Sequence, residues 1–257
     1  MKKYKFTGET KTIDLPFGTV TLHRIKAVVE FGLVKVGDLG GWIEKEENLS
    51  HEENAWVCGN TKVYGDAKVY GDAEVCGNAK VCGNADVYGD AKVCGNAKVC
   101  GNAKVYGDAK VCGDAKVCGK AWVCGDADVY GDAKVCGNSK VCGNAKVCGN
   151  AEVCGNAEVC GNAKVFSADH VLVIGAIGSR NDFTTFFRDK DNEITVKCGC
   201  FLGKIDKFLE KVTQTHKDTK HALVYRAAVE VAKLQIDLTE KVQGDEKVNG
   251  KSKIKIY

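Results

Sequence analysis

Proline and methionine occur once each among the 257 residues, and no apolar run approaches the twenty residues of a membrane-spanning helix. A single proline beside thirty glycines excludes a linker-rich chain. The first residues, MKKYKFTGETK, lack the apolar segment of a signal peptide, so we expect a cytoplasmic protein without a membrane partner. Histidine is absent from Ala55 to Asn162, which disfavours histidine-based catalysis there.

A strong excess of charge of either sign is also lacking. The formal net charge is +3, and in residues 55–162 the lysines balance the acidic side chains. A general polyanion binder carries a large basic excess. We therefore expect no nucleic-acid partner.

What is abundant is one six-residue repeat. Residues 55–162 form eighteen consecutive hexads of the pattern Ala-x-Val-(Cys/Tyr)-Gly-(Asn/Asp), without an insertion and with only Thr61, Ser139 and Lys120 departing from it. Alternation predicts a short strand with Ala and Val inside and the second and fourth residues outside, because lysine cannot be buried unpaired. Glycine followed by Asn or Asp predicts a corner. Strands and corners without helices indicate a β-solenoid.

Sorting the outward residues by candidate period favours three hexads per coil. With a period of 18, tyrosines stack on tyrosines and cysteines on cysteines, as in Tyr70, Tyr88 and Tyr106. Tandem duplication of 18-residue units would produce the same columns. The sequence predicts an all-β solenoid, a triangular parallel β-helix of about six coils, over residues 55–165. Trp56 and Trp122 take the outward second position of their hexads.

The hexad resembles that of the left-handed parallel β-helix superfamily of hexapeptide-repeat proteins. The match lies in the aliphatic residue followed four later by a small one, from Val57 with Thr61 to Val159 with Ala163. This resemblance implies homotrimers and, in many members, acyl transfer with a histidine and an extended loop between subunits. The chain offers neither feature in its hexads, so we expect no enzyme, and a monomer stays open beside the trimer.

The repeated cysteines have three interpretations. Like residues of neighbouring coils lie ~4.8 Å apart, within reach of a disulfide. Free thiols are the ordinary state in the cytoplasm, and a soft-metal thiolate array is the third alternative. The candidates for an inter-coil disulfide ladder are Cys58, Cys76, Cys94 and Cys112; Cys82, Cys100, Cys118, Cys136 and Cys154; and Cys124, Cys142 and Cys160.

A second outward column is basic. It contains Lys62, Lys80, Lys98, Lys116 and Lys134. Stacked ammonium groups repel one another, so the column is either a solvated face that prevents lateral association or a surface for an anionic partner.

Two non-repetitive segments flank the hexads. Residues 1–54 predict a β-rich N-terminal cap, with a strand at 19–29, because a solenoid end exposes unpaired strand edges. Residues 166–239 predict a small α+β C-terminal domain with three short strands in 170–201 and helices at 204–216 and 220–236. In the second helix, Leu223, Ala227, Val231 and Leu234 form the expected packing face. A tail, 240–257, completes the chain.

Both flanks resemble those of uncharacterised bacterial and prophage repeat proteins. The lead-in matches in a GGW-I segment, Gly40–Ile43, and in Asn48–Ser50. The C-terminal module matches in an IGSRN…TTFFR…CGCF pattern at Ile177–Asn181, Thr184–Arg188 and Cys198–Phe201. This resemblance implies no established activity.

Two sets of residues in the C-terminal module are candidates for binding. The most polar set is Arg180, Asn181, Thr184, Thr185 and Arg188. A weaker zinc candidate is Cys198, Cys200, His216 and His221, whose spacing fits no common zinc finger. We predict no cofactor.

These observations favour a non-enzymatic scaffold that presents its C-terminal module to an unknown protein or a small anionic ligand. An alternative is a phage-borne inhibitor that sequesters a small nucleotide or a host factor. An acyltransferase is the weakest of the three.

Overall fold

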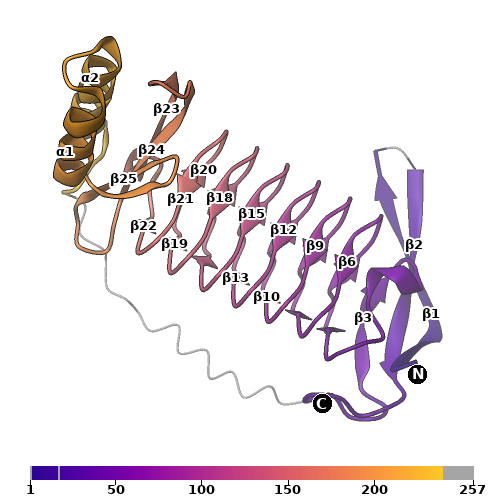
Figure 1. Cartoon of the computed structure of the whole chain (residues 1–257). Coiled ribbons are helices and arrows are strands. Elements are labelled where there is room, and N and C mark those ends of the chain that lie inside the picture. The colour runs from indigo at the N-terminus through magenta and orange to yellow at the C-terminus, as the bar shows by residue number, and fades with distance from the viewer. Residues whose placement is uncertain (1, 17, 240–257) are drawn as a thin grey trace.

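The computed structural model describes residues 2–16 and 18–239, and the predicted tail at 240–257 lies outside them. The chain forms a rod of stacked coils with a β-rich cap at its N-terminal end and an α+β module at the other end (Figure 1). The predicted fold class is confirmed. None of the helices in the described residues is long and apolar enough to cross a membrane.

Three sheets run along the rod, and each strand pairs in parallel with the strand 18 residues further on. Val93, for example, lies opposite Val111. Sheet 1 has the order β1 (Tyr4–Leu15), β2 (Gly18–Ala27), β3 (Leu39–Ile43), β5 (Lys62–Val63), β8 (Lys80–Val81), β11 (Lys98–Val99), β14 (Lys116–Val117), β17 (Lys134–Val135) and β20 (Glu152–Val153). Three hexads per coil are thus confirmed.

The other two sheets contain only repeat strands. Sheet 2 contains β4 (Trp56–Val57), β7 (Glu74–Val75), β10 (Lys92–Val93), β13 (Lys110–Val111), β16 (Asp128–Val129), β19 (Lys146–Val147) and β22 (Lys164–Val165). Sheet 3 contains β6 (Lys68–Val69), β9 (Asp86–Val87), β12 (Lys104–Val105), β15 (Trp122–Val123), β18 (Lys140–Val141) and β21 (Glu158–Val159).

The core of the rod is the valine and the alanine of each hexad. The hexad valines are fully buried, as predicted from the alternation. Thr61 and Ser139, which replace alanine, are also buried, and each hydroxyl donates to a carbonyl of the following coil, Val75 O at 3.2 Å and Val153 O at 3.0 Å. A buried hydroxyl needs such a partner. The core therefore accepts only small side chains at this position.

The N-terminal cap begins the solenoid earlier than expected. Strands β1 and β2 form an antiparallel hairpin, and β3 pairs in parallel with β5 of the first repeats. Leu49, just after a short 3-10 helix η1 (Glu46–Asn48), forms a parallel bridge with Val69. With β3 from the cap, sheet 1 has seven parallel strands, and sheet 2 reaches seven through β22 after the last hexad, so the rod has about seven turns rather than six.

Trp56 is covered by this cap. Its ring is only 7 % exposed and contacts Phe31 edge-on at a centroid distance of 5.4 Å. Trp122, in contrast, is 38 % exposed. The same hexad position is therefore open along the rod and closed at its N-terminal end.

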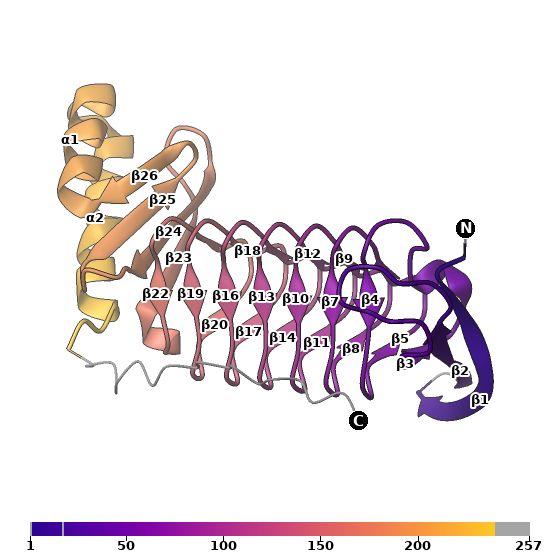
Figure 2. The ribbon, with the colours of Figure 1, turned by 90° about the horizontal axis from the view of Figure 1, so that it is seen from below.

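The C-terminal module packs two helices against one face of an antiparallel sheet (Figure 2). After a 3-10 helix, η2 (Ala168–His170), the sheet has the order β23 (Val171–Ile177), β24 (Asp182–Arg188), β25 (Ile194–Cys198) and β26 (Phe201–Lys204). The helices are α1 (Ile205–His216) and α2 (Lys220–Gln235). The sequence predicted three strands here, and the fourth is the short β26.

The prediction of which face of α2 packs against the module is wrong. The buried residues are Ala222, Tyr225, Ala228, Val229 and Ala232, on the opposite side of the helix. Leu223, Ala227, Val231 and Leu234 are exposed. The alanines let the helix backbone approach the sheet, whereas the larger leucines point to solvent.

Candidate functional site

Strand β24 joins the C-terminal module to the rod. Successive side chains of a strand point to opposite faces, so Phe187 enters the core of the solenoid and Phe186 enters the core of the module. At the end of the strand, Asp189 forms a β-bridge with Ala163, and the Lys190 amide donates to Asn162 O at 3.0 Å. The module sheet thereby covers the end of the last coil.

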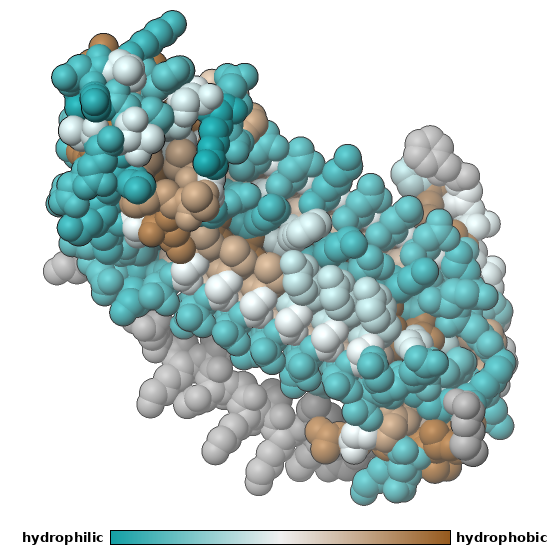
Figure 3. Space-filling view, viewed as in Figure 1, coloured by the Kyte–Doolittle hydropathy of each residue, from teal (hydrophilic) through white to brown (hydrophobic). Residues whose placement is uncertain are grey.

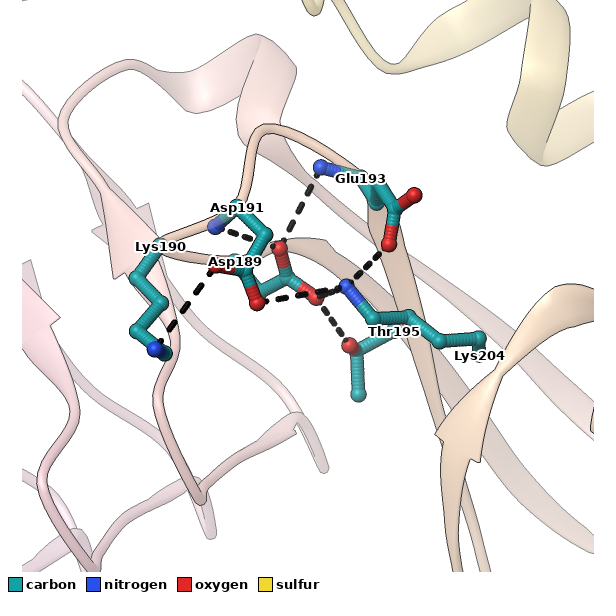
Figure 4. A network of polar contacts seen from close by, with 6 residues as sticks. All are labelled: Asp189, Lys190, Asp191, Glu193, Thr195 and Lys204. Carbon is teal, nitrogen blue, oxygen red and sulfur yellow. Dashed lines mark hydrogen bonds and ion pairs between the residues drawn. The ribbon is translucent and has the colours of Figure 1, made fainter.

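A buried carboxylate holds the turn after β24 (Figure 4). Asp189 accepts hydrogen bonds from the Thr195 hydroxyl at 2.6 Å and from the Asp191 amide at 3.0 Å, and it pairs with Lys204. Burial alone would raise the pKa of Asp189, but the hydrogen bonds from Lys204, Thr195 and the backbone outweigh it and lower this pKa. The network fixes β24 and β25, which line the site described next.

A polar cleft of about 440 Å³ lies between the last two coils and the module sheet. The rod contributes Asn138, Lys140, Asn156 and Glu158, and the module contributes Asp182, Phe183, Thr185, Lys197 and Gly199. The positive charges of Lys140 and Lys197 balance the negative charges of Glu158 and Asp182. Phe183 is 37 % exposed and gives the otherwise polar cleft an apolar surface.

Glu158 is the centre of this cleft. Its carboxylate lies 3.3 Å from the Lys140 ammonium and 3.3 Å from that of Lys197. Its backbone amide donates to the Thr185 hydroxyl at 3.0 Å, which ties the rod directly to β24. The Lys140 ammonium also lies 5.4 Å from the centroid of the exposed Trp122 ring. Two cations thus meet one carboxylate at the junction of rod and module, with the Phe183 ring in the cleft and the Trp122 ring beside Lys140 one coil away.

The five polar residues predicted from the sequence do not line one surface. Thr185 lines the cleft, and Arg180 lies beside Gly199 at its edge. Thr184 points to the other face of β24, where its buried hydroxyl contacts Cys198 Sγ at 3.3 Å. Arg188 is buried against His170 at 3.2 Å and over the Phe166 ring at 4.6 Å. Asn181 is exposed, with a positive φ of 50°, in the turn between β23 and β24.

The weaker zinc candidate does not assemble. Within residues 2–16 and 18–239, no three of Cys198, Cys200, His216 and His221 bring their ligand atoms within 4.8 Å of one another. Tyr225 lies between them, with its hydroxyl 3.8 Å from Cys198 Sγ and its ring 5.8 Å from that of His216. Cys200 is exposed.

The predicted lysine column lies along sheet 1. Lys62 pairs with Lys80, and the register continues through Lys98 and Lys116 to Lys134. Lys134 ends the column in an ion pair with Glu152 at 2.6 Å. Burial, together with the neighbouring charges of Lys11 and Lys80, lowers the pKa of Lys62. The column is therefore a continuous row of lysines along the outer face of sheet 1.

The cysteine columns also follow the predicted register, and the twelve ladder candidates are thiols rather than disulfides in this structure. Neighbouring thiols hydrogen bond in all three columns, for example Cys58 with Cys76, Cys82 with Cys100 and Cys124 with Cys142. Hydrogen bonds from Cys112 and Cys76 lower the pKa of Cys94. Hydrogen bonds with Cys58 and Cys94 raise the pKa of Cys76, and the hydrogen bond with Cys94 raises the pKa of Cys112. In this column, lowered and raised pKa values alternate from coil to coil, whereas the pKa values of the successive thiols Cys100, Cys118 and Cys136 are all raised.

An aromatic and sulfur-rich band runs along sheet 3. The rings of Tyr70, Tyr88 and Tyr106 stack at centroid distances of 4.8 and 4.9 Å. Cys124, Cys142 and Cys160 continue the column. Figure 3 shows this face as a band of white to brown side chains between hydrophilic ones, running toward the C-terminal module. The band leads toward the cleft.

Sequence reasoning missed the cleft residues Lys140, Glu158, Asp182 and Lys197. The hexads look alike in sequence, and only the docking of the module distinguishes the last two coils from the others. The signal that was available is the acidic residue Glu158 in the final hexad, where most hexads have lysine.

Neither a scan against protein-family models nor a search of curated proteins found a match to this chain.

Proposed function

We propose that this protein is a non-enzymatic scaffold, a stiff rod that presents a binding site at the junction with its C-terminal module. The observation that supports this most is the continuity of the core. One cluster of buried side chains extends from Tyr4 in the cap through every coil to Phe187 in β24. Close-packed interiors resist deformation, so the cleft keeps a fixed position relative to the cap.

The cleft has the composition of a protein-binding site. Exposed aromatic residues beside charged groups supply much of the binding energy in protein interfaces. Here Phe183 lines the cleft together with Lys140 and Lys197, and Trp122 lies beside Lys140. A partner with an acidic side chain would replace Glu158 as the counter-ion of these lysines. We therefore propose a protein partner with an exposed carboxylate.

A second candidate function is the capture of a small anionic ligand such as a nucleotide. The cleft volume, about 440 Å³, lies in the range of small-molecule sites, which supports this alternative. The phage origin implied by the resemblance of the flanks stays a prediction, as do the relation to hexapeptide-repeat proteins, the trimer and the disulfide ladder. The acyltransferase has the least support, because the uninterrupted hexads supply neither a histidine nor a loop.

The test is a comparison of two double variants. Lys140→Ala/Lys197→Ala removes both cations of the cleft, while Lys110→Ala/Lys146→Ala removes two exposed lysines of sheet 2 that do not line it. Both are used to capture partners from a lysate of the cell that makes the protein. We expect the cleft variant to lose the partner that the wild type retains, and the sheet 2 variant to keep it.

Equal capture by the two variants would refute the cleft as the binding site. A thermal-shift assay with a panel of nucleotides separates the second candidate. Stabilisation of the wild type but not of the cleft variant would favour the small anionic ligand over the protein partner. Circular dichroism of each variant checks that it is folded.

A further inference from the structure

Three side chains that can bind a metal ion meet where the N-terminal cap joins the rod. One ligand atom each from Cys58, Glu74 and Cys76 lies within 4.8 Å of the other two. Within residues 2–16 and 18–239, this is the one group of three or more His, Cys, Asp or Glu side chains with that property. All three are half-buried, so the group is neither sealed in the core nor fully open to solvent.

The fold explains why they meet. Cys58 and Cys76 occupy the same outward position in successive coils of sheet 2, and Glu74 lies two residues before Cys76 on the same strand face. The cap closes the N-terminal end of the group, because the backbone of Gly40 forms a β-bridge with Cys58. Trp56, directly above Glu74 in the register, is buried beneath the cap.

The neighbouring residue in the preceding coil distinguishes Glu74 from other glutamates of the hexads. Glu152 and Glu158 also lie beside pairs of stacked cysteines, but each has a lysine at the equivalent position one coil earlier. Lys134 pairs with Glu152 at 2.6 Å, and Lys140 pairs with Glu158 at 3.3 Å. Trp56 takes the place of that lysine above Glu74, and the lysine partner of Glu74 comes instead from the following coil, Lys92 at 3.4 Å. The carboxylate lies beside the thiols of Cys58 and Cys76.

We propose that Cys58, Glu74 and Cys76 form a binding site for Zn²⁺ or another thiophilic divalent cation. Zinc binds thiolates at ~2.3 Å and carboxylates at ~2.0–2.2 Å, which places ligand atoms roughly 3.5–3.8 Å apart in a tetrahedron. The three ligand atoms lie within 4.8 Å of one another, so each pair has to close by no more than about 1.3 Å to reach this separation. The fourth position remains open to water, as in zinc sites with three protein ligands.

Binding of the cation at this site releases protons from the two thiols. Each thiol loses a proton to solvent and forms a metal–sulfur bond, so one divalent cation displaces two protons. With the Glu74 carboxylate the site then carries one net negative charge. The Lys92 ammonium, 3.4 Å from the Glu74 carboxylate, compensates it. Since binding releases protons, affinity rises with pH. This site is independent of the cleft and of the scaffold function proposed above.

The experiment uses the full chain, reduced and kept under nitrogen, titrated with Co²⁺ as a spectroscopic substitute for Zn²⁺. We expect the first equivalent to give thiolate-to-cobalt charge-transfer bands and tetrahedral d–d bands, which one equivalent of Zn²⁺ abolishes. Cys58→Ser and Cys76→Ser should each lose most of the charge-transfer intensity. Glu74→Gln should weaken binding about tenfold or more, since even residues outside the ligand shell have effects of that size.

The matched control is Glu152→Gln, which alters a glutamate in an equivalent position that is paired with Lys134. It should bind Co²⁺ as the wild type does. A wild type without charge-transfer bands overturns the proposal, as does equal weakening by Glu152→Gln and Glu74→Gln. Binding of several equivalents with one shared affinity also overturns it, because it would show that any pair of stacked thiols suffices. Glu74→Gln keeps the test decisive if a cysteine variant fails to fold.

Discussion

At the corners of the rod, the backbone of one glycine lies against that of the next coil. Gly95 has a φ of +68°, and a Cβ atom built on it would lie 2.9 Å from both the N and the O of Gly113. Two constraints therefore act on the fifth residue of the hexad: a left-handed backbone and the close approach of another chain segment. Either one alone favours glycine, and together they explain its invariance along the repeats.

Two alanine substitutions separate these constraints. Gly155 has nearly the same φ, +69°, but has no atom within 4 Å of an added Cβ. Gly155→Ala should cost only the left-handed strain, ~1 kcal/mol of unfolding free energy. Gly95→Ala should cost a further ~1–3 kcal/mol from the collision. Urea unfolding followed by circular dichroism measures both. An equal loss of unfolding free energy in Gly155→Ala and Gly95→Ala would show that neighbouring coils move apart at no cost to make room for a methyl group.

At the scale of single elements, how well the sequence predicts the structure depends on what buries each element. The place and the buried side of each repeat strand were predicted correctly, since valine and alanine alternate with residues that include lysine, which has only one acceptable side. The strands are shorter than the predicted four residues and span only the second and third residues of each hexad. Helix α2 was located correctly, but its buried face was not. It has an apolar stripe on each side, and the sheet selects the side rich in alanine, Ala222, Ala228 and Ala232.

A pair of substitutions tests the two faces of α2. Leu234 is 89 % exposed, so Leu234→Gln should change the unfolding free energy by less than ~0.5 kcal/mol. Val229 is fully buried, and Val229→Ala should cost ~2 kcal/mol through the lost contacts and the cavity. Thermal unfolding of both variants supplies the comparison. A large loss with Leu234→Gln, or a change in its oligomeric state, would show that the outer stripe is covered in solution.

At the scale of the whole molecule, the rod is a one-dimensional stack whose ends are its weak points. Each end strand would expose unpaired backbone groups if it were not covered. The cap covers one end with β3, and the module covers the other through Phe187 and the bridge between Ala163 and Asp189. The sequence predicted the N-terminal cap for this reason, and it predicted the C-terminal module from the break in the repeat and the strand and helix patterns that follow it. It could not predict the cleft between rod and module, because that depends on contacts between segments far apart in the chain.

Removal of the module tests its capping role. A chain of residues 1–165 exposes the last strands, β20 to β22, and should associate end to end. Light scattering after size-exclusion chromatography should show larger species than for the full chain at equal concentration. A truncated chain of the same oligomeric state and the same thermal midpoint as the full chain would mean that the last coil is stable uncovered.

Oxidation tests the thiol columns along the whole rod. Mild oxidation should form disulfides between successive coils, such as Cys82 with Cys100, each closing a loop of 18 residues and adding ~3 kcal/mol. We expect the thermal midpoint to rise and the alkylation of the denatured chain, measured by mass, to fall in steps of two thiols. Covalent dimers without intramolecular bonds would contradict this, and would show that the columns are too strained to bridge.

Three hexads complete one coil, so the number of hexads sets an angle as well as a length. Removal of three hexads would shorten the rod by one layer and leave the cap and the module facing as they do now. Removal of a single hexad would turn the module by a third of a revolution about the rod axis relative to the cap. The number of hexads therefore sets the rotation of the module relative to the cap, and a chain of this kind can change that rotation without any change in the cap or the module.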